Sequence, residues 1–200
     1  MRMIRIKRLV PAFLTLVFSL SLLACEATVP PRNFPELTFQ HLEPIRLDVA
    51  SLETVSSYKP PMTAPNVDHM FPTSPLNALS RWVSDRLVAS GSGSVARFTI
   101  VDAAVRETTL TRKKGFTGAF TKDQSERYDA ALEATLEIID DSGSQKGFAS
   151  AKVSRSVTVR EDASVNDREQ AWFNLTEALM KDINGELEKN ISQYLANWVK

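Results

Sequence analysis

This sequence has little of what catalysis and metal binding usually require. Its 200 residues include two histidines and one cysteine. Nucleophilic catalysis needs a base beside a Ser, Thr or Cys, and that base is most often a histidine. Neither His41 nor His69 has a plausible partner in its own stretch, and His69 beside Asp68 is typical of a surface loop. We therefore expect no enzyme activity and no cofactor, and two isolated histidines do not make a zinc site.

The carboxylates and glycines offer no catalytic pattern either. The residue types of Asp140-Asp141-Ser142-Gly143 are typical of a turn. The segment lacks the twelve-residue ligand spacing of a calcium loop, so a hairpin turn is favoured over a calcium site. Glu133 and Glu137 share the polar face of a predicted strand, where acids are usually solvated. The segment 90–94 lacks the lysine and the following helix of a phosphate-binding loop, and it is interpreted as a linker.

The chain also lacks an excess of positive charge. It balances 24 basic residues against 24 acidic ones. Residues 1–24 contain four basic residues and no acidic one, so the segment from Cys25 onward has a net charge of −4. A mildly acidic domain lacks the excess of basic residues that binding to nucleic acid requires.

No apolar run is long enough to predict a transmembrane helix. Residues 1–8 carry four positive charges, and the apolar run 9–23 that follows is shorter than the roughly 20 residues a span needs. A positively charged N-terminal region, a short apolar region and small residues before a cleavage site are typical of a secretory signal peptide. We therefore predict a signal peptide over residues 1–24.

The end of this signal resembles the lipobox of bacterial lipoproteins, Leu22-Leu23-Ala24-Cys25. The resemblance implies lipidation of Cys25, with diacylglycerol on its thiol, cleavage after Ala24, and acyl chains such as palmitate on the new N-terminus. The alternative is an ordinary signal peptide followed by a chance cysteine. A single unpaired cysteine would be a liability in an oxidising periplasm, and two or more acyl chains give stable anchoring. Glu26, in place of the aspartate that retains enteric lipoproteins in the inner membrane, favours the periplasmic face of the outer membrane.

Behind the anchor, the composition predicts a tether and one domain. Residues 25–40 form a lipidated N-terminus and a proline-rich tether, because three prolines within residues 26–35 disfavour a helix. Residues 41–200 are predicted to form a single α+β domain, a length that suits one domain.

Hydrophobic periodicity predicts the order β-α-β-β-β-α. Alternation of apolar and polar residues indicates strands, and apolar residues at three- and four-residue steps indicate helices. The predicted elements are a strand over 44–55, a helix from Ser74 to Gly91, strands over 97–110, 128–138 and 147–160, and a helix over 166–198 capped by Asn166 or Asp167. We expect a four-stranded sheet with two helices on one face, in which the last three strands form an antiparallel meander.

This order resembles the small envelope lipoproteins of Gram-negative bacteria. The likeness rests on Cys25, the helix segment 81–87, the hairpin 128–159 and the closing helix 166–198. Similar families are the auxiliary lipoproteins of lipid-trafficking ABC transport systems and the lipoprotein that plugs the lipopolysaccharide-assembly barrel. The resemblance implies a partner in an envelope complex. The aromatic-Pro-Leu-Tyr signature of the barrel-plug family and the tyrosine-rich first strand of the transport family are both missing, so no functional residue is carried over.

The loop between the second and third long strands is the first candidate contact site. It combines exposed aromatics, cations and mobile glycines, which suit an anionic lipid surface or a protein partner. Its candidate residues are Arg112, Lys113, Lys114, Phe116, Phe120 and Lys122. The alternative is a loop that folds back so that both phenylalanines cap the core.

The end of the last helix is the second candidate, with Tyr194 and Trp198. That helix is longer than the sheet is expected to cover. The alternative is packing of its end against the strand at 44–55 or the proline-rich loop at 59–75. We expect a lipid-anchored protein that faces the periplasm and acts as an accessory or assembly factor in lipid transport or outer-membrane biogenesis. The other hypothesis is direct lipid or lipopolysaccharide binding, in a cleft between the sheet and the long helix.

Overall fold

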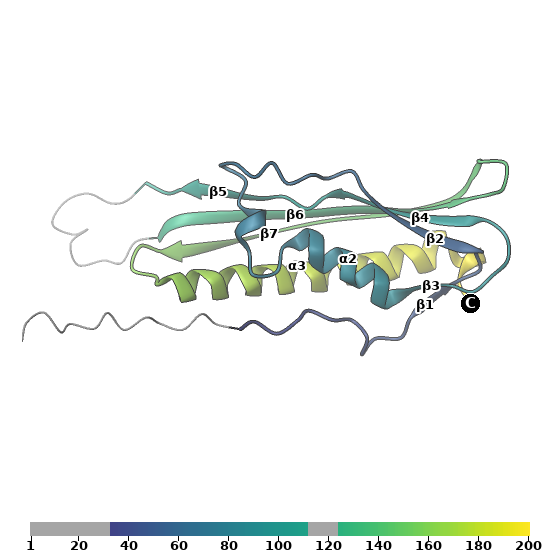
Figure 1. Ribbon diagram of the computed structural model, residues 1–200, viewed down its shortest axis with the longest axis horizontal. Helices are drawn as coiled ribbons and strands as arrows, with labels where there is room; N and C mark the ends of the chain where they lie inside the picture. Colours follow the sequence, from purple (N-terminus) through teal and green to yellow (C-terminus); the bar gives the residue numbers. More distant parts are fainter. Residues whose placement is uncertain (1–32, 112–123) are drawn as a thin grey trace, which may run out of the picture. The chain divides into compact units, whose positions relative to one another are not determined.

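The alternating segments of the sequence form a sheet that is covered by helices on one face (Figure 1). The structure is a computed structural model, and it describes residues 33–111 and 124–200. Its elements are, in chain order, β1 (Ile45–Leu47), β2 (Ser51–Ser56), η2 (Asp68–Met70), α2 (Pro75–Arg86), β3 (Leu87–Ala89), β4 (Val95–Asp102), β5 (Val105–Thr109), β6 (Gln124–Ile139), β7 (Gln145–Arg160), α3 (Val165–Tyr194) and η4 (Ala196–Trp198). The predicted α+β class is confirmed.

β6 lies at the centre of the main sheet. It pairs antiparallel with β7 on one side and with β4 and β5 on the other, and β2 pairs parallel with β4. The inward side chains of β6 are buried as the alternation predicted: Tyr128, Ala130, Leu132, Ala134, Leu136 and Ile138. The antiparallel meander expected from the sequence is confirmed.

The prediction of a four-stranded sheet is wrong in detail, because the main sheet has five strands within the described residues alone. The expected strand 97–110 is interrupted where the register shifts between Ile100 and Asp102. The carboxylate of Asp102 accepts a hydrogen bond from the N–H of Ala104 at 3.1 Å, which takes that N–H out of the ladder. β4 and β5 therefore follow one another along the same edge of β6 as two separate strands.

The expected strand 44–55 is also divided, and the first helix ends before Gly91. β1 and β3 form a separate parallel two-stranded sheet, in which Ile45 pairs with Leu87. The residues after Arg86 pair with β1 instead of continuing α2, so the predicted end of the helix is wrong. The cause is a contact between segments that are distant in the sequence.

The two α-helices, α2 and α3, lie against the same face of the sheet, with their apolar stripes toward it (Figure 1). α3 is capped by Ser164, whose hydroxyl accepts from the N–H of Asp167 while the Asp167 carboxylate accepts from the N–H of Ser164. This reciprocal pair is a capping box, and the cap lies two or three residues before the one expected at Asn166 or Asp167. The stripe predicted on the helix is buried, from Trp172 to Ile191.

Candidate functional site

Two of the predicted contact sites lie outside the described residues. These are the lipidation site Cys25 and the loop with Arg112, Lys113, Lys114, Phe116, Phe120 and Lys122. Thr109 of β5 pairs with Glu126 of β6, so the two strands that flank this loop meet at one end of the sheet. Contact of the loop with a partner or a membrane stays a prediction.

The end of the chain folds back onto the domain. The backbone N–H of Asp48 donates to the carbonyl of Trp198 at 2.7 Å, and Val199 forms a bridge with Leu47. A Cβ atom on Gly147 would lie 2.9 Å from the indole of Trp198, so this ring lies directly on the backbone of β7. Trp198 is thus half-buried against the core, while Tyr194 is 58% exposed. Of the two candidates, Tyr194 is the one with its side chain largely open to a partner.

Residues 33–42, which we call the strap, lie against the helical layer without regular secondary structure and end in a turn, where the N–H of Leu42 donates to the carbonyl of Phe39 at 3.0 Å. Phe34 stacks on Phe173 of α3 with ring centroids 5.1 Å apart. The N–H of Phe39 donates to Asp85 of α2 at 2.9 Å, and Glu36 forms an ion pair with Arg81. The part of the predicted tether from residue 33 to 40 therefore contacts both helices.

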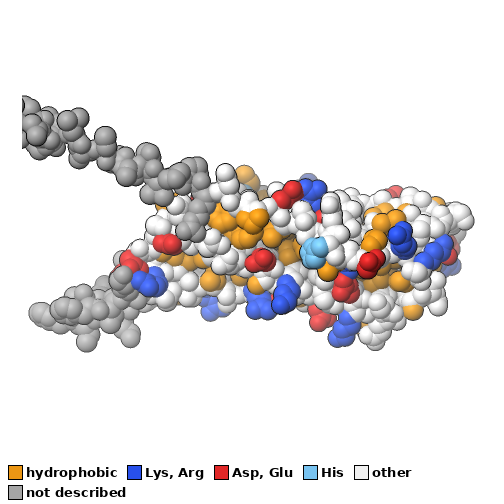
Figure 2. Space-filling view, turned by 90° about the horizontal axis from the view of Figure 1, so that it is seen from below, with side chains coloured by type: hydrophobic (Ala, Val, Ile, Leu, Met, Phe, Trp, Pro, Cys, Tyr) orange, Lys and Arg blue, Asp and Glu red, His pale blue; other side chains and the backbone are white. Residues whose placement is uncertain are grey.

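A groove of about 600 Å³ lies between the strap and α3. We call it the strap groove, and its lining residues are Leu37, Thr38, Phe39, His41, Leu42, Glu177, Ala178, Met180, Lys181 and Asn184. Half of them are apolar, and two of these, Phe39 and Met180, belong to the buried core. Figure 2 looks onto this face of the molecule, where hydrophobic side chains gather among scattered charges. The groove thus joins an apolar floor to a polar rim.

Two polar side chains of the strap groove have donors to offer. The Asn184 carbonyl oxygen accepts from the indole N–H of Trp82 at 2.7 Å, which fixes the orientation of this amide. Its NH₂ group is therefore free for another acceptor, since no partner for it is found within the described residues. Lys181 is exposed and forms no ion pair in the described part of the chain.

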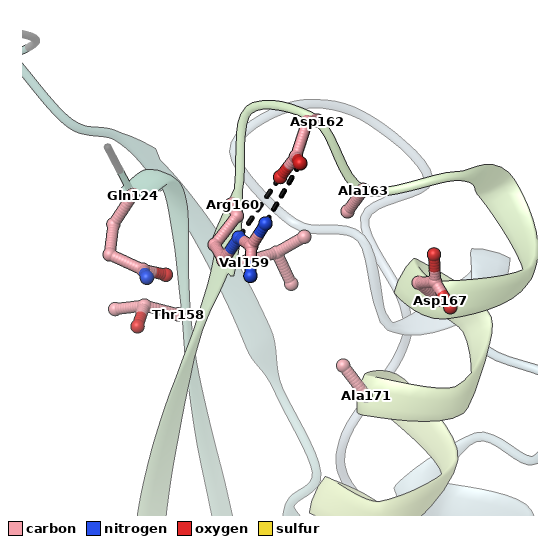
Figure 3. Close-up of a pocket in the computed structure, with 8 residues that line it drawn as sticks. All are labelled: Gln124, Thr158, Val159, Arg160, Asp162, Ala163, Asp167 and Ala171. Atoms are coloured by element: carbon pink, nitrogen blue, oxygen red, sulfur yellow. Dashed lines mark hydrogen bonds and ion pairs between the residues drawn. The ribbon is translucent and has the colours of Figure 1, made fainter. Parts of the chain in front are cut away.

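A second hollow, of about 490 Å³, lies where β7 leads into α3 (Figure 3). Arg160 and Asp162 form a two-fold hydrogen-bonded ion pair at its edge, at 2.9 and 2.8 Å. Hydrogen bonding to Asp162 raises the pKa of the Arg160 guanidinium. The remaining lining residues include Gln124, the first described residue after the loop, so this hollow lies at the loop's end of the sheet. Its lining is more polar than that of the strap groove.

The other face of the main sheet is covered by neither α2 nor α3. Its side chains are mixed: Glu53 pairs with Arg97 at 3.1 Å and Glu133 with Lys152 at 2.6 Å. Val55 and Phe148 are each 43% exposed. The register puts both on this face, since Val55 aligns with Thr99 and Phe148 with Glu137. The sheet thus presents a broad mixed surface with apolar side chains in it.

The titratable groups form no metal site in the described ranges, where no group of three or more His, Cys, Asp or Glu side chains is close enough to hold an ion. Asp140 accepts from the N–H groups of Ser142 and Ser144 at 2.9 Å, as expected for a hairpin turn. Hydrogen bonds from Ser142, and then from Lys146, lower the pKa of this carboxyl. None of the described helices is long and apolar enough to cross a membrane.

Sequence reasoning missed the strap groove. The signal was present, because Phe34, Leu37, Phe39 and Leu42 interrupt a segment whose prolines otherwise predict a tether. Apolar residues at that density are unusual in a solvated linker, and they indicate packing against a surface. The residues of α3 that line the groove gave no signal, because Ala178 and Lys181 fit an ordinary amphipathic helix.

No family model matches the chain, and no curated protein matches its sequence. Among solved structures, the chain is similar to rare lipoprotein B from Shewanella oneidensis, with 11% identity over 72% of this chain and 95% of that one, and a TM-score of 0.38. It is also similar to a minor lipoprotein from Acinetobacter baumannii, with 16% identity over 76% and 96% of the two chains and a TM-score of 0.38. A neuraminyllactose-binding hemagglutinin homolog from Helicobacter pylori has 14% identity over 82% and 96%, and a TM-score of 0.32. Likeness of this degree assigns neither a family nor an activity to the chain.

Proposed function

We propose that this protein is a lipid-anchored envelope protein that works by binding, as a non-enzymatic accessory or assembly factor in a complex that faces the periplasm. The lipobox Leu22-Leu23-Ala24-Cys25 supports the anchor, and Glu26 favours the outer membrane over the inner one. The resemblance to small envelope lipoproteins implies a partner complex in lipid transport or outer-membrane biogenesis.

The observation that carries the binding role is the uncovered face of the main sheet. Exposed apolar side chains, Val55 and Phe148, lie there among charged and hydroxyl-bearing residues. Non-obligate protein interfaces have this mixed composition, with about as much apolar area as the rest of a protein surface. The proposed partner therefore packs against the sheet, on the side opposite the helices, and the loop with Phe116 and Phe120 adds to that contact.

The test is an affinity pull-down of the tagged, full-length protein from detergent-solubilised membranes, followed by mass spectrometry. We expect an envelope complex to co-purify with the wild-type chain. The double variant Val55→Ser with Phe148→Ser should lose most of the recovered partner, and so should Phe116→Ser with Phe120→Ser. Val165→Ser is the matched control, because Val165 is 66% exposed at the start of α3 on the helical side. Equal recovery with all variants, or no protein partner at all, would contradict the proposal.

A further inference from the structure

We propose that the strap groove binds one acyl chain of an anionic lipid. The groove measures about 600 Å³, which is within the range of roughly 300–1,000 Å³ typical of small-ligand sites. Leu37, Leu42 and Met180 give it apolar walls, and its polar residues stand at the rim. This position differs from the cleft between the sheet and the long helix, where Ala130 and Ala134 are buried at 3% and 0% exposure.

The chemistry of the walls favours an acyl chain over a peptide. An extended peptide needs a hydrogen-bond partner for each buried backbone group. One wall is α3, whose backbone groups are bonded within the helix, so a peptide could pair only with the strap. There the N–H of Phe39 is already bonded to Asp85, and the carbonyl of Phe39 accepts from the N–H of Leu42 at 3.0 Å. An acyl chain needs no such partners, and the burial of its methylene groups in an apolar groove is favoured by the hydrophobic effect.

The rim has donors for the head of an anionic lipid, and one acid, Glu177, whose carboxylate can only accept, from a hydroxyl or ammonium group of that head. The free amide NH₂ of Asn184 and the ammonium of Lys181 are one turn apart on α3, and both line the groove. Together they offer donors and a positive charge to an ester carbonyl, a carboxylate or a phosphate. Trp82 holds the Asn184 amide in place, so this donor is preorganised.

The strap begins close in sequence to the proposed anchor. Leu37 is twelve residues after Cys25, so an anchored chain keeps it within about 40 Å of the membrane surface even when fully extended. Lipid of the same leaflet is therefore within reach of the groove. The proposal uses the anchor of the proposed function but not its protein partner.

Photo-crosslinking tests this site in the full-length protein, reconstituted in phosphatidylethanolamine–phosphatidylglycerol vesicles. One arm contains phosphatidylglycerol with a diazirine in one acyl chain, and the other contains a diazirine-bearing free fatty acid. We expect the label in peptides from residues 33–42 or 177–184. Ala178→Trp should fill the groove and cut this label about tenfold, the loss that corresponds to roughly two unburied methylenes. Ser192→Trp, an exposed position on the same helix outside the groove, is the matched control.

The two arms distinguish the source of the chain. Label from phosphatidylglycerol identifies a membrane phospholipid, and label from the fatty acid alone identifies a free fatty acid. Thermal unfolding of both tryptophan variants is the folding control. Midpoint temperatures equal to that of the wild type exclude a folding defect. Absence of label from these peptides in both arms, or equal label in Ala178→Trp and Ser192→Trp, would overturn the acyl-chain site. The pull-down of a protein partner does not depend on either result.

Discussion

Arg86 is a buried charge that links three segments of the chain. It is 3% exposed, and its guanidinium donates to the backbone carbonyl of Glu43 and to the carboxylate of Glu188 on α3. We expect Arg86→Met, which keeps the volume but removes the donors, to lower the free energy of unfolding by about 1–3 kcal/mol, because the Glu43 carbonyl loses its partner. Urea denaturation measures this. Glu188→Gln keeps an acceptor but leaves the buried Arg86 guanidinium without its carboxylate, so it should also lower the free energy of unfolding, by at least about 1 kcal/mol. An Arg86→Met variant as stable as the wild type would refute this role.

Asp182 gives the stability of the fold a dependence on pH. Its carboxylate accepts two hydrogen bonds from Arg155, at 2.5 and 2.9 Å, and these lower the pKa of Asp182 below its ordinary value of 3.8. A group with a lowered pKa in the folded state stabilises the fold above its ordinary value, and this contribution is lost as the pH falls through the lowered value. Asp182→Asn should therefore be less stable than the wild type near pH 6, by at most about 1 kcal/mol, and the gap should narrow below about pH 3. Urea denaturation at both pH values measures it, and a gap that widens on acidification would contradict the assignment.

Gly91 lies two residues after the end of β3, directly against the chain after β1. A Cβ atom there would lie 2.6 Å from the backbone carbon of Asp48 and 2.7 Å from the backbone nitrogen of Val49. We expect Gly91→Ala to lower the free energy of unfolding by about 1–3 kcal/mol, because backbone atoms must move to admit the methyl group. Gly93→Ala is the matched control in the same turn, since nothing lies within 4 Å of a Cβ there. Equal stability of the two variants would show that the close approach has no energetic cost.

The elements were predictable where the pattern that defines them is local. The alternation of β6 identified its buried face correctly, since one side of that strand packs under the helices. The end of α2 was missed because Leu87 pairs with Ile45, a contact that no local window contains. The break between β4 and β5 had a signal in Asp102, a short polar side chain in an apolar run that can bond to nearby backbone.

At the scale of the whole molecule, the sequence predicted the layers but not how the N-terminal segment lies on them. The strap from residue 33 onward contains no helix, as the prolines predicted, yet they do not reveal that Phe34 stacks on α3 and that the N–H of Phe39 bonds to α2. The strap groove exists only because these side chains meet a particular stretch of α3, so it depends on tertiary packing. Tertiary packing also gives the two predicted contact residues at the end of the last helix different surroundings. Tyr194 is exposed, whereas the ring of Trp198 covers Gly147.

The proposed anchor would determine where the whole molecule works, and it depends on one residue. Lipidation of Cys25 requires its thiol, and a serine in its place cannot accept diacylglycerol through a thioether. We expect Cys25→Ser either to release the protein from membranes or to leave it uncleaved, which would add the mass of residues 1–24. Membrane fractionation and mass spectrometry of the intact protein separate the two outcomes. A substitution at Ser21, outside the four lipobox residues, is the matched control and should leave both processing and fractionation unchanged. If Cys25→Ser is cleaved normally and stays with the membrane, the cysteine is a chance neighbour of an ordinary signal peptide, and the domain reaches the membrane by its own surface.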